Sequence, residues 1–197
     1  MASLLHTSDT ARRLLLGLYA CWLASEVWIR FSRPAHTGGP RHDRDTRVAI
    51  ALGIAGGLSL GGRVSSGDSG PWIVYRSWLL FWFGMVVGLA GISLRVWAVR
   101  TLGRFFQLSL VVQERHHVVR SGPYRVLRHP SYAGPILTCI GLGVIHDNWL
   151  SLLFFTALPT AAFAYRISVE ERMLVSGLGE EYEEYRRGTW RLVPFLW

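Results

Sequence analysis

The sequence predicts an all-α integral membrane protein with about five transmembrane helices. Half of its 197 residues are hydrophobic and only 17% are charged, below the roughly 25% that is usual for soluble globular chains. Five apolar runs alternate with polar segments, and a helix needs about 20 apolar residues to cross a bilayer. The 9 tryptophans fit a chain with membrane interfaces, where the indole ring prefers to lie. This composition excludes a disordered chain and disfavours a soluble domain.

The first apolar run, residues 14–31, is expected to be a transmembrane helix. Arg12 and Arg13 precede it, as they would in a signal peptide, but no small-residue cleavage site follows and further apolar runs come later. Glu26 lies inside the run. Because an ionised carboxylate is costly in lipid, its side chain is expected to face protein or the membrane interface.

The second and third runs contain regularly spaced glycines. The second run covers residues 48–62, and the third begins at residue 72 or 77 and ends at residue 99. Glycine at every fourth position leaves a smooth stripe on one helix face, where another helix can approach closely. The glycines with this spacing are Gly53, Gly57 and Gly61 in the second run and Gly84 and Gly88 in the third.

The C-terminal half contains the polar motifs. A long polar segment, residues 101–131, leads into a hairpin of two apolar helices, 135–145 and 151–167. The compact turn 146–149 joins them. An amphipathic tail helix and a short apolar end are expected from residue 169 onward.

The 21 basic residues are all arginine, and they outnumber the 13 acidic residues to give a net charge of +8. Nucleic-acid binding would require a basic stripe or patch, but these arginines lie mainly between apolar runs, so no nucleic-acid partner is expected. Segments 33–47, 101–131 and 172–197 carry four, five and four arginines. Because arginine is enriched in cytoplasmic loops, this predicts an external N-terminus and a cytoplasmic tail, against the indication of Arg12 and Arg13.

Neither the cysteines nor the histidines indicate a metal site. Cys21 and Cys139 lie within apolar runs and match no metal-ligand spacing. His116, His117 and His129 are close in sequence but lack the set of three or four suitably spaced ligands that zinc sites use. No metal is therefore expected.

The polar segment before the hairpin contains two rigid turns. Pro123 follows glycine, and Pro130 restricts the residue before it to an extended conformation. These turns hold Tyr124, His129 and Tyr132 in a fixed relation, which suits the binding of a flat ring such as adenine. An aromatic belt at the membrane interface would have the same composition, and composition alone does not choose between the two.

Arg166 and Glu170 lie at the end of the last span, four residues apart and thus on one helix face. Ionisable side chains in such a place are candidates for a functional site. The alternative is a surface ion pair worth only about 0.3–0.5 kcal/mol. Position alone leaves both interpretations open.

Together these segments resemble the isoprenylcysteine carboxyl methyltransferase family. Their order and spacing match the family over about residues 105–197, whereas residues 1–100 resemble it only in being membrane spans. Arg-His-Pro-x-Tyr is moderately specific by itself and strongly so when the hairpin and the acidic tail follow it. The matching motifs are Gly122-Pro-Tyr124, Arg128-His-Pro-Ser-Tyr132-x-Gly134, Arg166-x3-Glu170-Glu171, Leu178-Gly-Glu-Glu-Tyr182-x2-Tyr185 and Val193-Pro194.

The resemblance implies that the chain binds S-adenosylmethionine. Arg166 matches the arginine that the family assigns to the substrate carboxylate, and Glu170 matches a cofactor-binding glutamate, with Glu171 beside it offering the same chemistry. The interval between Gln113 and the histidines is shorter here than in the family. The residues expected at the cofactor are Gln113, His116, His117, Val118, Val119, Tyr124, His129, Pro130, Ser131, Tyr132 and Glu170.

The activity implied is carboxyl methylation of a prenylcysteine-like carboxylate by a multi-pass membrane enzyme whose active site faces the cytoplasm. Residues 1–100 would form three spans, and residues 101–197 the catalytic region, with a cofactor-binding loop and a tail. The expected partners are membrane lipid and a lipophilic small molecule or lipidated substrate. Methylation of a phospholipid amine or a small thiol stays open, as do a membrane reductase of the sterol type and a non-enzymatic scaffold. The sequence predicts no oligomeric state.

Overall fold

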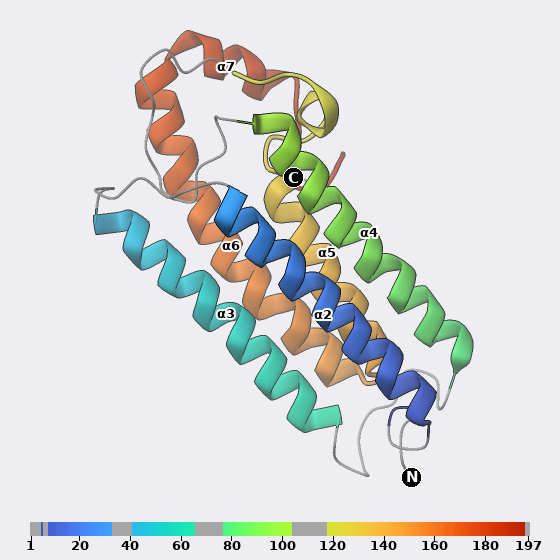
Figure 1. Ribbon diagram of the computed structural model, residues 1–197. Helices are drawn as coiled ribbons and strands as arrows, with labels where there is room; N and C mark the ends of the chain where they lie inside the picture. Colours follow the sequence, from blue (N-terminus) through green and yellow to red (C-terminus); the bar gives the residue numbers. More distant parts are fainter. Residues whose placement is uncertain (1–4, 6–7, 33–40, 66–76, 104–117, 196–197) are drawn as a thin grey trace.

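The computed structural model describes residue 5 and residues 8–32, 41–65, 77–103 and 118–195, and five long helices dominate it (Figure 1). Four helices contain segments long and apolar enough to cross a membrane, and the fifth is a shorter apolar helix. The predicted all-α membrane fold with about five apolar helices is confirmed. The helices are α2 (Asp9–Ser32), α3 (Arg41–Ser65), α4 (Trp78–Leu102), α5 (Pro130–Ile145) and α6 (Trp149–Leu178).

Successive helices run in opposite directions along the bundle (Figure 1). The C-terminal ends of α2, α4 and α6 therefore lie at the same end as the N-terminal ends of α3 and α5. A short 3-10 helix, η2 (Gly122–Arg125), and the last helix, α7 (Glu180–Arg187), also lie there. The polar motifs that are far apart in the sequence thus meet at one end of the bundle.

Helix α3 packs against α6 through its glycine stripe. A Cβ atom on Gly53 would lie 2.9 Å from the carbonyl oxygen of Leu158, and one on Gly57 would lie 2.8 Å from that of Phe154. Gly61 meets a phenylalanine ring of α6 just as closely. Backbones can approach this far only where no side chain intervenes, so the predicted packing face is confirmed.

The same principle joins α4 to α5. A Cβ atom on Gly84 would lie 2.7 Å from the carbonyl oxygen of Gly141, and one on Gly91 would lie 2.6 Å from that of Gly134. Gly88 contacts a leucine of α2 as well as the backbone of α5. These contacts bring the backbones of α4 and α5 together with no large side chain between them, while a leucine of α2 packs on Gly88.

The predicted turn between the two hairpin helices is also confirmed. Helix α5 ends at Ile145, and Asn148 caps the start of α6, where its side chain accepts hydrogen bonds from the backbone N–H groups of Leu150 (2.9 Å) and Ser151 (3.1 Å). This satisfies two of the donors that a helix N-terminus leaves unpaired.

The prediction that the last span ends near residue 167 and that a separate tail helix starts at residue 169 is wrong. Helix α6 is 30 residues long and continues past residue 167 to Leu178. It ends where Gly179 adopts a φ of +55°. No glycine or proline interrupts residues 160–176, so nothing breaks the helix before that point. Arg166 and Glu170 consequently lie on one continuous helix that reaches beyond the apolar bundle.

Candidate functional site

The Tyr132 side chain joins the two charged residues that the sequence singled out. Its hydroxyl donates a hydrogen bond to Glu170 Oε2 (2.6 Å) and accepts one from Arg166 Nε (3.2 Å). Arg166 also donates from Nη1 to Thr46 Oγ1 of α3 (2.8 Å) and is only 3% exposed. Arg166 and Glu170 are thus parts of a partly buried hydrogen-bonded network across three helices, not a surface ion pair.

A cavity of about 240 Å³ lies between the helices on the Arg166 side of this network. We call it the interhelix cavity. Apolar side chains make up half of its lining, and three arginines and one glutamate supply the charge. The lining residues are Trp22, Glu26, Arg47, Ile50, Ile54, Arg95, Tyr132, Pro135, Phe163 and Arg166.

Glu26 and Arg95 form a double ion pair at the wall of the interhelix cavity. Arg95 Nε and Nη2 lie 3.1 and 3.2 Å from the two carboxylate oxygens of Glu26. Arg95 Nη1 donates to the backbone oxygen of Ser131 (2.7 Å). The expectation that Glu26 faces protein is confirmed, and its partner, which the sequence did not reveal, is an arginine of α4. This pairing offsets the cost of placing two charges within the apolar bundle.

A second cavity, of about 100 Å³, lies on the Glu170 side, between the loop before α5 and the tail. We call it the loop–tail cavity. Five residues expected at the cofactor line it: Val118, Val119, Tyr124, His129 and Glu170. The lining also includes Leu102, Arg128, Leu174, Leu178, Tyr182 and Tyr185, which the sequence did not single out as site residues.

The other expected cofactor residues are placed differently. Pro130 and Ser131 are buried at the start of α5 and are not part of this lining. Tyr132 lines the interhelix cavity and reaches the loop–tail cavity through its hydrogen bond to Glu170. Gln113, His116 and His117 lie outside the described residues.

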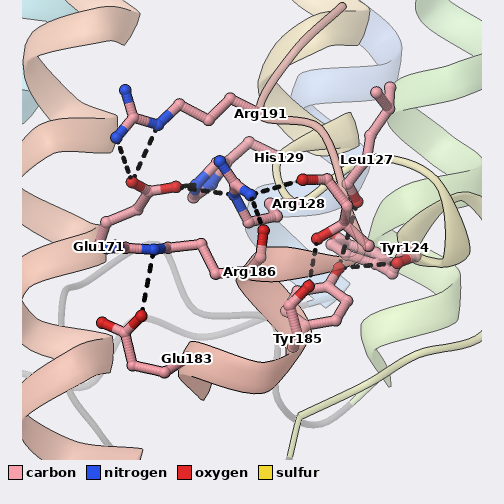
Figure 2. Close-up of polar contacts among 10 residues, drawn as sticks. Tyr124, Leu127, Arg128, His129, Glu171, Glu183, Tyr185, Arg186 and Arg191 are labelled. Atoms are coloured by element: carbon pink, nitrogen blue, oxygen red, sulfur yellow. Dashed lines mark hydrogen bonds and ion pairs between the residues drawn. The ribbon is translucent and has the colours of Figure 1, made fainter. Parts of the chain in front are cut away.

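Glu170 and Glu171 are neighbours in sequence with different environments. Glu171 is buried, and its Oε1 lies 3.0 Å from Arg128 Nε and 3.3 Å from His129 Nε2. Its Oε2 accepts from Arg191 Nε (3.0 Å) and lies 2.9 Å from Arg191 Nη2. Figure 2 shows these side chains converging on the Glu171 carboxylate. Glu171 therefore holds the tail to the loop, and Glu170 presents its carboxylate to the cavity.

Two tyrosines of α7 complete the loop–tail cavity. The Tyr185 hydroxyl donates to the backbone oxygen of Tyr124 (2.7 Å), and burial raises the pKa of Tyr185 to about 12. The Tyr182 hydroxyl is buried with no hydrogen-bond partner in the described part of the chain, and burial raises the pKa of Tyr182 well above its ordinary range. Both hydroxyls are therefore neutral, and that of Tyr182 is available to a ligand. In the sequence, only the three-residue spacing of Tyr182 and Tyr185 on a predicted helix indicated that the two side chains share a helix face.

Helix α7 is also tied to the start of the loop at the protein surface. Glu181 accepts a hydrogen bond from the backbone N–H of Val118 (2.9 Å), and Arg120 pairs with Glu184 at 2.8 Å. The Arg120 hydrogen bond holds the pKa of Glu184 below its ordinary value. We call these exposed contacts the surface clasp. They bring α7 over the Val118 side of the loop–tail cavity.

The fold and the site define a class: a multi-pass helical membrane protein in which a charged cavity between the spans meets a second cavity under a loop and a tail. The family follows from comparison with known sequences. Residues 82–176, just under half of the chain, match the sequence model of the isoprenylcysteine carboxyl methyltransferase (ICMT) family. The resemblance that the motifs predicted is confirmed.

Known relatives agree in sequence and in fold. Protein-S-isoprenylcysteine O-methyltransferase B of Arabidopsis thaliana is 36% identical over 123 residues, which are 61% of this chain and 62% of the plant protein. A probable protein-S-isoprenylcysteine O-methyltransferase of Oryza sativa subsp. indica is 34% identical over 121 residues, which are 60% of this chain and 63% of the rice protein.

A solved structure of the eukaryotic intramembrane Ras methyltransferase ICMT matches with a TM-score of 0.60 at 25% identity. The match covers 92% of this chain and 63% of that one. The chain thus spans less than two thirds of the length of each of these relatives. The shared fold and the apolar helices place the protein in the membrane.

Proposed function

We propose that the protein transfers a methyl group from S-adenosylmethionine to a lipophilic carboxylate, in the first place the carboxylate of a prenylcysteine. One observation carries the proposal: the Tyr132 hydroxyl bridges Arg166, which lines the interhelix cavity, and Glu170, which lines the loop–tail cavity. The two cavities thus meet at a hydrogen-bonded junction, as a transfer between two bound molecules requires. The names of the plant relatives support this choice of reaction.

The side chains that line the loop–tail cavity suit the polar and apolar groups of S-adenosylmethionine. The Glu170 carboxylate can accept hydrogen bonds from hydroxyl or ammonium groups, and the unpartnered hydroxyl of Tyr182 adds a donor. Val118 and Val119 give an apolar surface on which an adenine ring can lie. When bound, S-adenosylmethionine supplies an electrophilic methyl group on a sulfonium. The task of these side chains is to bind and orient it.

The interhelix cavity suits an anionic acceptor. Arg47, Arg95 and Arg166 line it against a single carboxylate, that of Glu26, which is paired with Arg95. A carboxylate is already ionised at neutral pH, so no general base is needed. The planar guanidinium of Arg166 can hold a carboxylate through two hydrogen bonds, which makes it a positioning group. An amine acceptor would place another positively charged group beside these three arginines.

The apolar part of the same cavity suits a lipid chain. Trp22, Ile50, Ile54 and Phe163 belong to α2, α3 and α6, which are membrane helices. A prenyl chain partitions into lipid and can reach such a cavity from within the bilayer. We further propose that the loop–tail cavity faces the cytoplasm, because the helix ends gathered at that end adjoin the arginine-rich sequence segments 33–47, 101–131 and 172–197.

Transfer of an isotopically labelled methyl group to N-acetyl-S-farnesylcysteine by the detergent-purified protein tests the proposal. We expect a product whose label is released by alkali, because a methyl ester is base-labile. We also expect Arg166→Gln to lose most of this activity while retaining its fold. A base-stable product from a phospholipid amine or a small thiol would overturn the carboxylate assignment, and the absence of transfer to any of these acceptors would overturn methyl transfer itself.

A further inference from the structure

The C-terminal segment that follows α7 is paired with the chain just before α5. The backbone N–H of Arg128 donates to the oxygen of Trp190 (2.7 Å), and the N–H of Trp190 donates to the oxygen of Val126 (2.9 Å). Helix α5 begins at Pro130, two residues after this pairing ends. The C-terminal segment is therefore fixed at the level where the apolar bundle begins. At the same end of the bundle, Arg100 lies 5.2 Å from the centre of the Trp28 ring, an arrangement typical of a membrane interface.

A hollow of about 400 Å³ opens on this segment, and arginine dominates its wall. We call it the arginine hollow. None of its lining residues in the described part of the chain is acidic. The residues that carry the argument are Arg128, Arg186, Arg187, Trp190 and Arg191.

The nearby carboxylates lie behind the wall of the hollow and are shared with other cationic groups. Arg128 and Arg191 share one carboxylate, that of Glu171, which His129 also contacts. Arg186 lies 3.4 Å from Glu183. Arg187 is exposed in the last turn of α7 and interacts with Glu184, whose carboxylate is already paired with Arg120. The described wall of the hollow itself carries four arginines and no carboxylate, which favours an anionic ligand.

Exposed apolar side chains occur in the two paired segments beside the arginine hollow. Val126, Trp190, Val193 and Phe195 are all exposed, and Phe195 is 86% exposed. Trp190 lines the hollow, and its ring lies 5.5 Å from that of Phe195, so these two side chains form one aromatic patch. Aromatic groups next to arginines at the start of a membrane span are typical of an interfacial anchor.

We propose that the arginine hollow binds the phosphodiester headgroup of an anionic phospholipid, with the Trp190–Phe195 patch in contact with the acyl region. Guanidinium groups bind phosphate through paired, charge-assisted hydrogen bonds, and each arginine near an anionic membrane surface contributes measurably to binding. A bound lipid would stabilise the segment that holds Glu171, and through it His129 at the loop–tail cavity. The proposal is independent of the methyl-transfer reaction.

Native mass spectrometry and thermal unfolding of the detergent-purified protein, titrated with phosphatidylglycerol or phosphatidylcholine, test this site. We expect phosphatidylglycerol to bind and to raise Tm, and phosphatidylcholine to do so far less. The double variant Arg186→Gln/Arg187→Gln should weaken phosphatidylglycerol binding by about tenfold to thirtyfold. The matched control Arg44→Gln/Arg172→Gln removes two exposed arginines elsewhere and should bind as the wild type does.

A further variant and two comparisons distinguish a phospholipid site from other causes of binding. Phe195→Ser should weaken phosphatidylglycerol binding several-fold, because it removes the most exposed of these apolar side chains and leaves the arginines in place. If both double variants lost phosphatidylglycerol binding equally, the net charge of the protein alone would explain the binding, and the proposed site would be wrong. Equal binding of the two lipids, or an equal rise in Tm with inorganic phosphate alone, would likewise overturn a phospholipid site.

Discussion

The interhelix cavity and the loop–tail cavity share Tyr132 at their junction but are built in different ways. The first lies between helices that glycine stripes bring into backbone contact, as at Gly57 on α3 and Gly91 on α4. The second is closed by segments far apart in sequence, which are joined by hydrogen bonds such as that from Tyr185 to Tyr124 and by the pairing of Arg128 and Arg191 with Glu171.

The walls of the two cavities are therefore held in place differently, by helix packing in the first and by polar contacts in the second. Close-packed helix contacts do not depend on salt or pH and set the shape of the interhelix cavity. The walls of the loop–tail cavity depend on charge pairs, from the buried Glu171 cluster to the exposed surface clasp. Substitutions in the two regions should therefore differ in how strongly they affect stability and binding, and in how far those effects change with salt and pH.

The largest effect is expected from Glu171→Ala. This change leaves the guanidinium groups of Arg128 and Arg191 without their buried carboxylate, and the loss of one partner of a buried pair costs about 3–5 kcal/mol. Thermal unfolding in detergent should show a large drop in Tm. The neighbouring Glu170→Gln serves as the control and should change Tm little. If the two variants unfolded at the same temperature, the distinction between the two glutamates would be wrong.

The next largest effect is expected at the α3–α6 contact. Gly57→Ala places a Cβ atom 2.8 Å from the carbonyl oxygen of Phe154, and overpacking of this kind costs about 1–3 kcal/mol. Gly62→Ala, on the same helix, meets nothing within 4 Å and should be neutral or slightly stabilising, because alanine favours a helix more than glycine does. Tm measured in detergent checks the pair, and equal shifts would contradict close packing on the glycine stripe.

Tyr132→Phe is expected to separate activity from stability. The change removes the hydroxyl that joins Arg166 to Glu170. It should reduce methyl transfer by about tenfold or more, because hydrogen bonds to charged groups are worth about 1.5–3 kcal/mol each, and should lower Tm only slightly. Initial rates and Tm are the measurements. Wild-type rates in this variant would show that the two cavities do not communicate through Tyr132.

The smallest effect is expected at the surface clasp. Arg120→Ala removes the exposed pair with Glu184 and should weaken cofactor binding by only about twofold to threefold at low salt. The Arg120 hydrogen bond lowers the pKa of Glu184, so the pair is complete at neutral pH and is lost only as the pH falls through that lowered value. Titrations at low and high salt should converge for wild type and variant, and a salt-independent difference would contradict this account.

The sequence predicted those parts of the molecule that follow from local periodicity. Gly53, Gly57 and Gly61 recur at the helical repeat, so their shared face could be inferred before any partner was known. Glu26 stood out because a carboxylate within an apolar run is costly. In both cases the feature was visible and its partner, α6 or Arg95, was not, because partners across a bundle leave no local pattern.

Other features depended on contacts between distant segments. The different environments of Glu170 and Glu171 arise from Arg191 and Arg128, which approach from two other parts of the chain. The sequence did not predict the continuation of α6 to Leu178, because the change from apolar to amphipathic composition near residue 168 resembles a helix boundary. The helix in fact ends at Gly179, where the backbone adopts a positive φ.

The central claim is that Glu170 faces the cofactor and Arg166 faces the acceptor, with Tyr132 between them. Calorimetric titration of S-adenosylhomocysteine into detergent-purified wild type, Glu170→Gln and Arg166→Gln tests it directly. The account predicts binding by the wild type, at least about tenfold weaker binding by Glu170→Gln, from the loss of a charge-assisted hydrogen bond, and nearly unchanged binding by Arg166→Gln. Full binding by Glu170→Gln, or no binding by a folded Arg166→Gln protein, would contradict it.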